Sequence, residues 1–300
     1  MKSIKPALSI LLALASLLLI APAAAADDEP PPLYSNHPEL LPSLGEHKPR
    51  LAEVWYPHIL AAGLHSIAPD AEMVILDHEE FAPDESAAYA KIIAATRAAS
   101  PVPVGVYGFA GRRYGLHAWH QIAAYNVENV DGKAPNDDKW RRNNLANKAA
   151  DLEAAKADVE RQRPAAAAAD ILGPVLYAHY VQPPAVAYET AAAQLADAKA
   201  EAVAAEEWAV ANIKYYQPRG PRRIVAFVSP AVAGRFGGDR GLLPREQREA
   251  ILRACVDAGV SPLIWMAQPE RPERAPSVAA ARRMALRYWE LLDEREQPAD

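Results

Sequence analysis

The sequence predicts a TIM-like (β/α) barrel, with parallel strands in the wall and helices on the outside. Short apolar runs alternate with longer helical segments along most of the 300-residue chain. A short, uninterrupted apolar run is typical of a parallel strand that is buried on both faces. The helices between these runs are long enough to cross back over the sheet, and this alternation favours a parallel sheet with both faces covered.

The first 26 residues have the pattern of an export signal. Lys2 and Lys5 precede an apolar run from Ala7 to Ile20, and the small residues Ala23–Ala26 supply a cleavage site. We therefore expect a signal peptide over residues 1–26 and export to the periplasm or the medium. No later apolar run reaches membrane-spanning length, so no membrane span is expected after signal removal.

Charge and cysteine content narrow the classes of protein to consider. The formal net charge is −6, which argues against non-specific binding of nucleic acid. The single cysteine, Cys255, excludes an intrachain disulfide and lies on the apolar side of a predicted helix, where it is expected to pack. Stability must then come from an apolar core, which a composition of 51% hydrophobic residues permits.

The elements can be assigned in order along the chain. Residues 27–49 are rich in proline and acid and are expected to run extended ahead of a single barrel domain, residues 50–300. Leu51, Val54 and Trp55 have helical spacing, which predicts a helix over residues 50–67. Strands are predicted at 73–76, 103–109, 171–181, 223–228 and 263–266. Further helices are predicted from Asp84 or Ser86 to Ala99, over 185–213, from Pro244, and in a last segment ending near Leu292; the charged, alanine-rich segment 118–169 is interpreted as a helical insertion.

The run from Met73 to Phe81 carries the candidate catalytic residues. Acidic side chains appear directly after its four apolar residues, at the strand end where parallel barrels build active sites. Because side chains alternate along a strand, Asp77 and Glu79 are expected on the same side, with Cα atoms about 6.6 Å apart, and Glu80 on the other. Two carboxylates this close hold a proton on one of them, as a general acid requires. Acids also favour helix N-termini, so a purely structural role is the alternative.

Neither a metal nor a cofactor is predicted. The pair His117-x-x-His120 has ligand spacing, but no third ligand accompanies it. The glycine-rich run Gly234–Gly238 lacks the spacing of a dinucleotide or phosphate loop.

Five motifs follow one another over residues 70–267. They are Asp77-His-Glu-Glu-Phe81, Gly105-Val-Tyr-Gly-Phe109, Leu172-Gly-Pro-Val-Leu-Tyr177, Val225-Ala-Phe227 and Ala258-Gly-Val-Ser-Pro-Leu-Ile-Trp265. In this order they resemble the hyaluronidase family of glycoside hydrolases. The family's corresponding runs are Asp-x-Glu-Glu-aromatic, Gly-Tyr-Tyr-x-Phe, Leu-Tyr-Pro-Ser-Ile-Tyr, Phe-Ala-Tyr and Gly-Ala-x-Gly-x-x-x-Trp-Gly.

The resemblance implies a substrate-assisted, retaining mechanism. The acetamido group of an N-acetylhexosamine attacks the anomeric carbon, so the enzyme needs no nucleophile of its own. By the resemblance, Glu79 is the acid and then the base, and Asp77 orients the acetamido nitrogen and stabilises the developing positive charge. Tyr177 would bind the acetamido oxygen, and Trp265 would supply an apolar face for the sugar ring.

Other positions extend or weaken the resemblance. Tyr107 is expected to line the pocket or the core, and Phe227 stands where the family has a tyrosine that helps hold the substrate. Arg112, just beyond the strand, lies where it could contact a carboxylated sugar, although a solvated loop arginine is the simpler interpretation. The family's first strand has no clear counterpart, and Leu33-Tyr34 is a candidate remnant of its second. The barrel is therefore expected to lack or alter its first strand.

The sequence thus predicts an exported glycosidase, without cofactor, that acts on a polysaccharide containing N-acetylhexosamine. One alternative keeps the barrel without catalysis, as a carbohydrate-binding or structural protein of the cell envelope. Phe227 favours that alternative, and the intact Asp77-x-Glu79 pair opposes it. A second alternative is a barrel glycosidase with a carboxylate nucleophile on another strand, for which Glu270, just beyond the last strand, is the available acid.

Overall fold

The computed structural model describes most of the predicted barrel. The described residues are 30–55, 67–77, 86–108, 157, 159–178, 181–214, 222–231 and 241–296. The chain divides into two compact units, residues 1–31 and 32–300, and every element named below belongs to the second. The predicted signal peptide and most of the predicted insertion at 118–169 lie outside the described residues.

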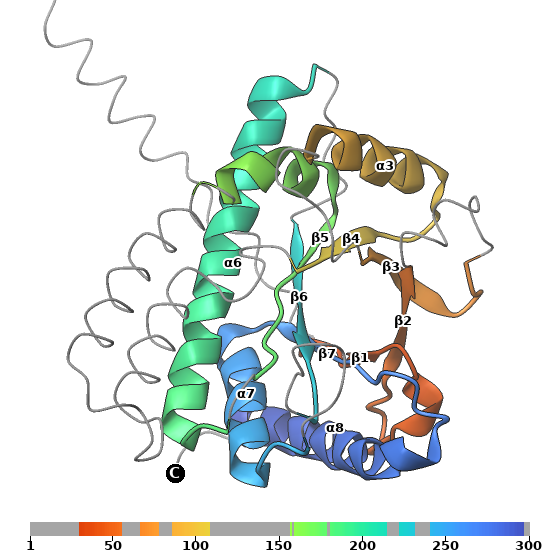
Figure 1. Ribbon diagram of the computed structural model, residues 1–300, viewed down its shortest axis with the longest axis vertical. Helices are drawn as coiled ribbons and strands as arrows, with labels where there is room; N and C mark the ends of the chain where they lie inside the picture. The colour runs from red at the N-terminus through yellow and green to blue at the C-terminus, as the bar shows by residue number, and fades with distance from the viewer. Residues whose placement is uncertain are drawn as a thin grey trace, which may run out of the picture. The chain divides into compact units, whose positions relative to one another are not determined.

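Seven parallel strands close into a barrel in the order in which they occur along the chain (Figure 1). They are β1 (Tyr34–Ser35), β2 (Arg50–Trp55), β3 (Ala71–Leu76), β4 (Val104–Tyr107), β5 (Ile171–Gly173), β6 (Arg223–Val228) and β7 (Ser261–Ile264). Each strand pairs with its sequence neighbours, and β1 pairs with both β2 and β7. The TIM-like (β/α) barrel is therefore confirmed, with seven strands among the described residues.

The short strand β1 closes the barrel with the help of side chains. The amide of Asn36 donates from Nδ2 to the Met266 carbonyl at 2.9 Å and accepts from the Met266 N–H at 3.0 Å. The hydroxyl of Ser35 donates to the carbonyl of Ile264 at 3.1 Å. These bonds prolong the pairing of a two-residue strand with β7. The barrel thus begins at Tyr34, inside the segment 27–49 that was expected to run ahead of it.

The prediction of a helix over residues 50–67 is wrong for residues 50–55, where the structure can be compared with it. Residues 50–55 form β2, which pairs with β1 and β3, and residues 56–66 lie outside the described residues. Ala52 and Val54 contribute to the cluster inside the barrel, and Trp55 packs in a cluster outside it. This is the period of two of a strand. Over so short a run, apolar residues at 51, 54 and 55 fit either period, and strand pairing decided between them.

Four long helices are described in the structure. They are α3 (Ser86–Ala99), α6 (Pro184–Asn212), α7 (Arg245–Ala258) and α8 (Ala275–Glu296), with short 3₁₀ helices η1 (Pro38–Leu40) and η3 (Pro272–Arg274). Their positions confirm the helices predicted after Asp84 or Ser86, over 185–213, from Pro244 and at the end. Helix α7 ends at Gly259, whose φ of 62° is the left-handed conformation that glycine adopts without strain. Among the described residues, no helix has both the length and the apolar character needed to cross a bilayer.

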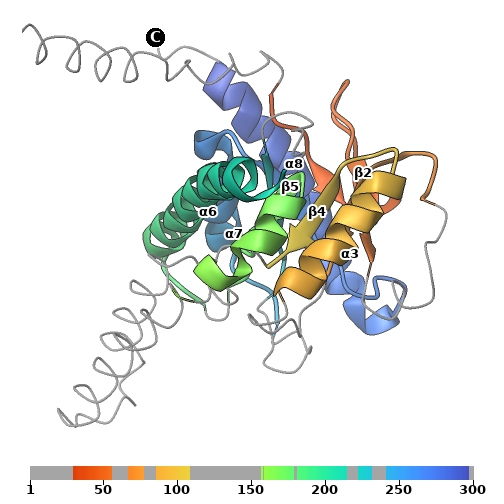
Figure 2. The ribbon, with the colours of Figure 1, turned by 90° about the horizontal axis from the view of Figure 1, so that it is seen from above.

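The core has an inner and an outer part. The inner part fills the barrel, and the outer part lies between the strands and the helices, where α7 packs against both α6 and α8. The helical residues 159–168 lie beside α6, as the ion pair between Arg163 and Glu201 shows (Figure 2). Cys255 of α7 is fully buried in the outer core, as expected. Burial raises the pKa of the Cys255 thiol to about 12, so the thiol stays protonated.

Candidate functional site

The end of β3 directs a carboxylate into the barrel. Met73 and Ile75 belong to the inner cluster, while Val74 and Leu76 belong to an outer one. The N–H of Asp77 donates to the carbonyl of Trp55 at 2.9 Å, so the pairing of β2 with β3 continues to this residue. Alternation along the strand then directs the Asp77 side chain inward, and the residue is only 4% exposed. The predicted partner Glu79 lies outside the described residues.

Four aromatic side chains gather inside the barrel at the carboxyl ends of its strands. They are Tyr107 of β4, Tyr177 beyond β5, Phe227 of β6 and Trp265 beyond β7, called here the aromatic cluster. Tyr107 lies edge-on to Phe227 with ring centroids 4.8 Å apart. The centroid distances from Tyr107 to Tyr177 and from Phe227 to Trp265 are both 6.4 Å. These are favourable aromatic separations, and each ring supports its neighbour.

The aromatic cluster has a buried base and a partly exposed rim. Phe227 is completely buried, whereas Tyr107, Tyr177 and Trp265 each keep part of their surface accessible. The last registered pair of β3 and β4 is Leu76 with Val106, so Asp77 and Tyr107 follow it at the same edge. A buried carboxylate and three partly exposed rings therefore occupy the carboxyl end of the barrel, where catalytic groups are found in this architecture.

Glycine in β5 makes room for the base of the aromatic cluster. A Cβ at Gly173 would lie 2.8 Å from Cε2 of Phe227 and 2.8 Å from the carbonyl oxygen of Val106. Both separations are shorter than a carbon atom tolerates, so a side chain here would displace the ring or the strand. Beyond Gly173, the N–H of Leu176 donates to the Phe227 carbonyl at 2.8 Å. This bond continues the pairing with β6 and brings Tyr177 to the rim.

Tyr89 is a residue of the site that the sequence reasoning did not select. It lies on α3, and its hydroxyl donates to the carbonyl of Leu76 at 3.0 Å, one residue before Asp77. Burial, with a smaller contribution from the charge of Asp77, raises the pKa of Tyr89 above its ordinary value. The one local signal was its place on the buried face of α3, with Ser86, Ile93 and Thr96, and that spacing indicates packing alone.

The remaining predicted positions fall into two groups. Glu80 and Arg112 lie outside the described residues, as do His117 and His120. Glu270, the acid available to a different glycosidase mechanism, is exposed. In the part of the chain that the structure describes, no three side chains of His, Cys, Asp or Glu are grouped so that they could hold a metal ion.

No protein-family model matches the chain, and no curated protein matches it. Two solved structures of bee venom hyaluronidase are similar to it. One is 12% identical, with 74% of this chain and 69% of that chain covered and a TM-score of 0.39. The other, in complex with a hyaluronic acid tetramer, is 13% identical, with 74% and 66% covered and a TM-score of 0.35. The fold assignment itself rests on the order and pairing of the strands in this chain.

Proposed function

We propose that this protein is an exported glycoside hydrolase that cleaves a polysaccharide containing N-acetylhexosamine by a substrate-assisted, retaining mechanism. The observation that carries the proposal is that the buried Asp77 and three partly exposed aromatic rings lie at the same, carboxyl end of the barrel. The motifs in which these residues occur, and the adjacent Glu79, are those that resemble the hyaluronidase family. The signal pattern of residues 1–26 supports export.

The rim of the aromatic cluster is suited to a sugar ring. Pyranose rings present apolar C–H faces, and an aromatic ring offers a flat apolar surface with a polar atom at its edge. Trp265 follows β7 and Tyr107 ends β4, so a sugar bound between them would contact two sides of the barrel. In the proposal, Trp265 forms the floor under the ring, and the Tyr177 hydroxyl holds the acetamido oxygen in position to attack.

The burial of Asp77 serves the chemistry of this mechanism. Attack by the acetamido oxygen gives a cyclic intermediate with positive charge on its nitrogen side. A carboxylate in a site screened from water stabilises such a charge more strongly than one in solvent. In the proposal, Asp77 orients the acetamido N–H and faces this charge. Glu79 donates a proton to the glycosidic oxygen and then removes one from the attacking water.

The proposal is tested by reducing-end release from hyaluronan, chondroitin and chitin oligosaccharides, with the wild type compared with Glu79→Gln. We expect the wild type to cleave at least one of them and the variant to lose about 10²–10⁴-fold in kcat, because it removes the general acid without changing its size. Glu207→Gln, on the exposed face of α6, is the matched control and should keep full activity. A folded wild type that cleaves none of these substrates would contradict the proposal.

A second function, carbohydrate binding without cleavage, is favoured by Phe227. This ring lacks the hydroxyl of the tyrosine that the hyaluronidase motif carries, and it is fully buried at the base of the aromatic cluster. The same oligosaccharides distinguish the two functions. A binding protein would retain them uncut in equilibrium dialysis, and Trp265→Ala would abolish the retention while Glu79→Gln would leave it unchanged.

A further inference from the structure

The peptide that joins Leu76 to Asp77 is held at both of its polar ends. Its N–H, on Asp77, donates to the Trp55 carbonyl of β2 at 2.9 Å. Its carbonyl, on Leu76, accepts from the Tyr89 hydroxyl of α3 at 3.0 Å. Because a peptide is planar with N–H and C=O on opposite sides, the two bonds pull from opposite directions. The peptide cannot rotate without breaking one of them, and it leads directly to the Cα atom of Asp77.

Both bonds are shielded from water, which makes their loss costly. Trp55, Asp77 and Tyr89 are 5%, 4% and 6% exposed. In the register of β3 with β4, the Leu76 carbonyl also faces the N–H of Tyr107, so the Tyr89 hydroxyl is a second donor to this oxygen. Without that hydroxyl, one restraint on the peptide is lost in a site where no water replaces it. The Tyr89 hydroxyl therefore adds a side-chain restraint from α3 to the peptide that carries Asp77.

Tyr89 itself stays outside the barrel. It belongs to an outer cluster with Val74, Leu76, Val104 and Val106, which is separate from the cluster inside the barrel. It can act on a bound sugar only through the peptide that it holds. Burial raises the pKa of the Tyr89 hydroxyl, so the hydroxyl stays protonated at neutral pH and remains a donor there.

The β2 side of the same peptide is also braced. The indole of Trp55 donates from Nε1 to Oε2 of Glu53 at 2.8 Å. The other carboxylate oxygen, Oε1, accepts from the N–H of Ala68 at 2.6 Å, just before β3 begins. The strand that receives the Asp77 N–H is thus tied to the turn leading into β3. This leaves the bond to Tyr89 as the contact that a single atom change can remove.

We propose that Tyr89 is a positioning residue for Asp77, and that its hydroxyl fixes the Leu76–Asp77 peptide so that the carboxylate faces the aromatic cluster. The inference rests on the proposed function for its catalytic consequence, but the placement of Asp77 can be tested without activity. Tyr89→Phe removes one oxygen atom and keeps the ring that packs against β3 and β4.

The experiment compares wild type, Tyr89→Phe and Tyr188→Phe. The last variant is a matched control, because the Tyr188 hydroxyl bonds an exposed carboxylate, Asp257, at 2.8 Å between α6 and α7. On the oligosaccharide that the wild type cleaves, we expect Tyr89→Phe to lower kcat about 10-fold, within the loss that misplacement by 1 Å produces. KM should stay within about twofold, because the aromatic rim is untouched, and Tyr188→Phe should change neither constant.

The second readout is the NMR spectrum of Asp77, recorded as the backbone amide and the side-chain carboxyl resonances. Both should shift in Tyr89→Phe and stay in place in Tyr188→Phe. If the wild type cleaves none of the substrates, the proposed function fails while shifted resonances still support the positioning role. Unshifted Asp77 resonances, or an unchanged kcat in a folded Tyr89→Phe protein, overturn it. A rise in KM at constant kcat also overturns it.

Discussion

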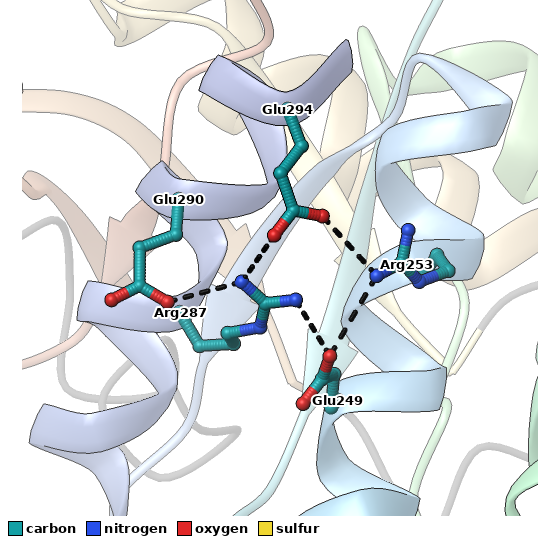
Figure 3. Close-up of polar contacts among 5 residues, drawn as sticks. All are labelled: Glu249, Arg253, Arg287, Glu290 and Glu294. Carbon is teal, nitrogen blue, oxygen red and sulfur yellow. Dashed lines mark hydrogen bonds and ion pairs between the residues drawn. The ribbon is translucent and has the colours of Figure 1, made fainter. Parts of the chain in front are cut away.

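Carboxylates at the carboxyl end of the barrel and on the outer surface of α7 and α8 differ in their burial and in what they bond. At the barrel end, Asp77 is buried, and its backbone is held by bonds to β2 and, one residue earlier, to α3. On the helix surface, Arg287 bonds Glu249 at 2.7 Å, Glu290 at 3.0 Å and Glu294 at 2.7 Å (Figure 3). Arg253 completes that network with Glu249 at 3.6 Å and Glu294 at 3.3 Å.

The difference separates charges that contribute to stability from the charge of Asp77, to which the proposed function gives a chemical role. The carboxylates of the helix network are 28–56% exposed, so water screens each pair and its contribution is about 0–1 kcal/mol. The network stabilises the packing of α7 on α8 through several weak ion pairs and not through one strong pair. A buried carboxylate costs free energy to fold, and that cost is typical of groups kept for function. Removing a charge at the barrel end should therefore change mainly kcat, whereas removing one on the helix surface should change mainly the free energy of unfolding.

Asp77→Asn should give the largest effect, and it should appear in activity. The change is isosteric and removes the charge that, in the proposed mechanism, stabilises the intermediate, so we expect kcat to fall about 10²–10³-fold. The fold should be retained, because an amide needs less solvation than a carboxylate and keeps the shape. Steady-state kinetics and thermal melting together check this. A kcat within threefold of wild type would contradict a catalytic role for the charge of Asp77.

Gly173→Ala should give the next largest effect, and it should appear in stability. The new methyl group would press on Phe227 and on the Val106 carbonyl, and we expect a loss of about 1–3 kcal/mol in the free energy of unfolding. Phe227→Leu in the same chain should recover part of this loss, because it relieves one of the two contacts. Urea unfolding of the two single variants and the double variant measures the coupling, expected to be at least about 0.5 kcal/mol. If the effects of the two substitutions were strictly additive, the methyl group at position 173 would not press on the Phe227 ring.

Arg287→Gln should give the smallest effect, and it should depend on pH. The hydrogen bond from Arg287 lowers the pKa of Glu249 and of Glu294 below the ordinary value. A carboxyl with a lowered pKa stabilises the folded state above its unfolded pKa, about 4.3, and this stabilisation is lost as pH falls through the folded value. We expect a loss of about 0.5–1 kcal/mol at pH 7 that shrinks below about pH 4.

Arg283→Gln is the control for this pH dependence, because it removes an exposed arginine of the same helix. Unfolding curves between pH 3 and pH 7 should show the converging difference for Arg287→Gln alone. A constant difference across that range would mean that Arg287 stabilises the helices by packing of its stem and not by charge.

Much of the barrel follows from local patterns. The uninterrupted apolar run before Asp77 predicted β3, and the residue range of β6 was predicted from its own apolar run. The Ala-rich segment predicted α6 to within one residue at each end. Tyr107, Tyr177, Phe227 and Trp265 were selected from motifs, and the barrel brings all four together. The strands and the helix could be predicted because each lies on a stretch of chain long enough to show a local pattern of its own.

Three features could be decided only by the tertiary structure. β1 has two residues and is too short to show a period. The residues that hydrogen-bond it and Asn36 to β7 and Met266 lie 229 and 230 positions later in the sequence. β2 has apolar residues that fit a helix as well as a strand, and pairing with β1 and β3 settled its form. Tyr89 has the spacing of an ordinary buried helix residue, and its role depends on the strand end beneath it. The sequence by itself determined which segments are apolar and where the acidic residues begin. The pairing of distant backbone segments decided which of them form the wall of the barrel. The reason is that hydrogen bonds between strands join residues that are far apart in the sequence.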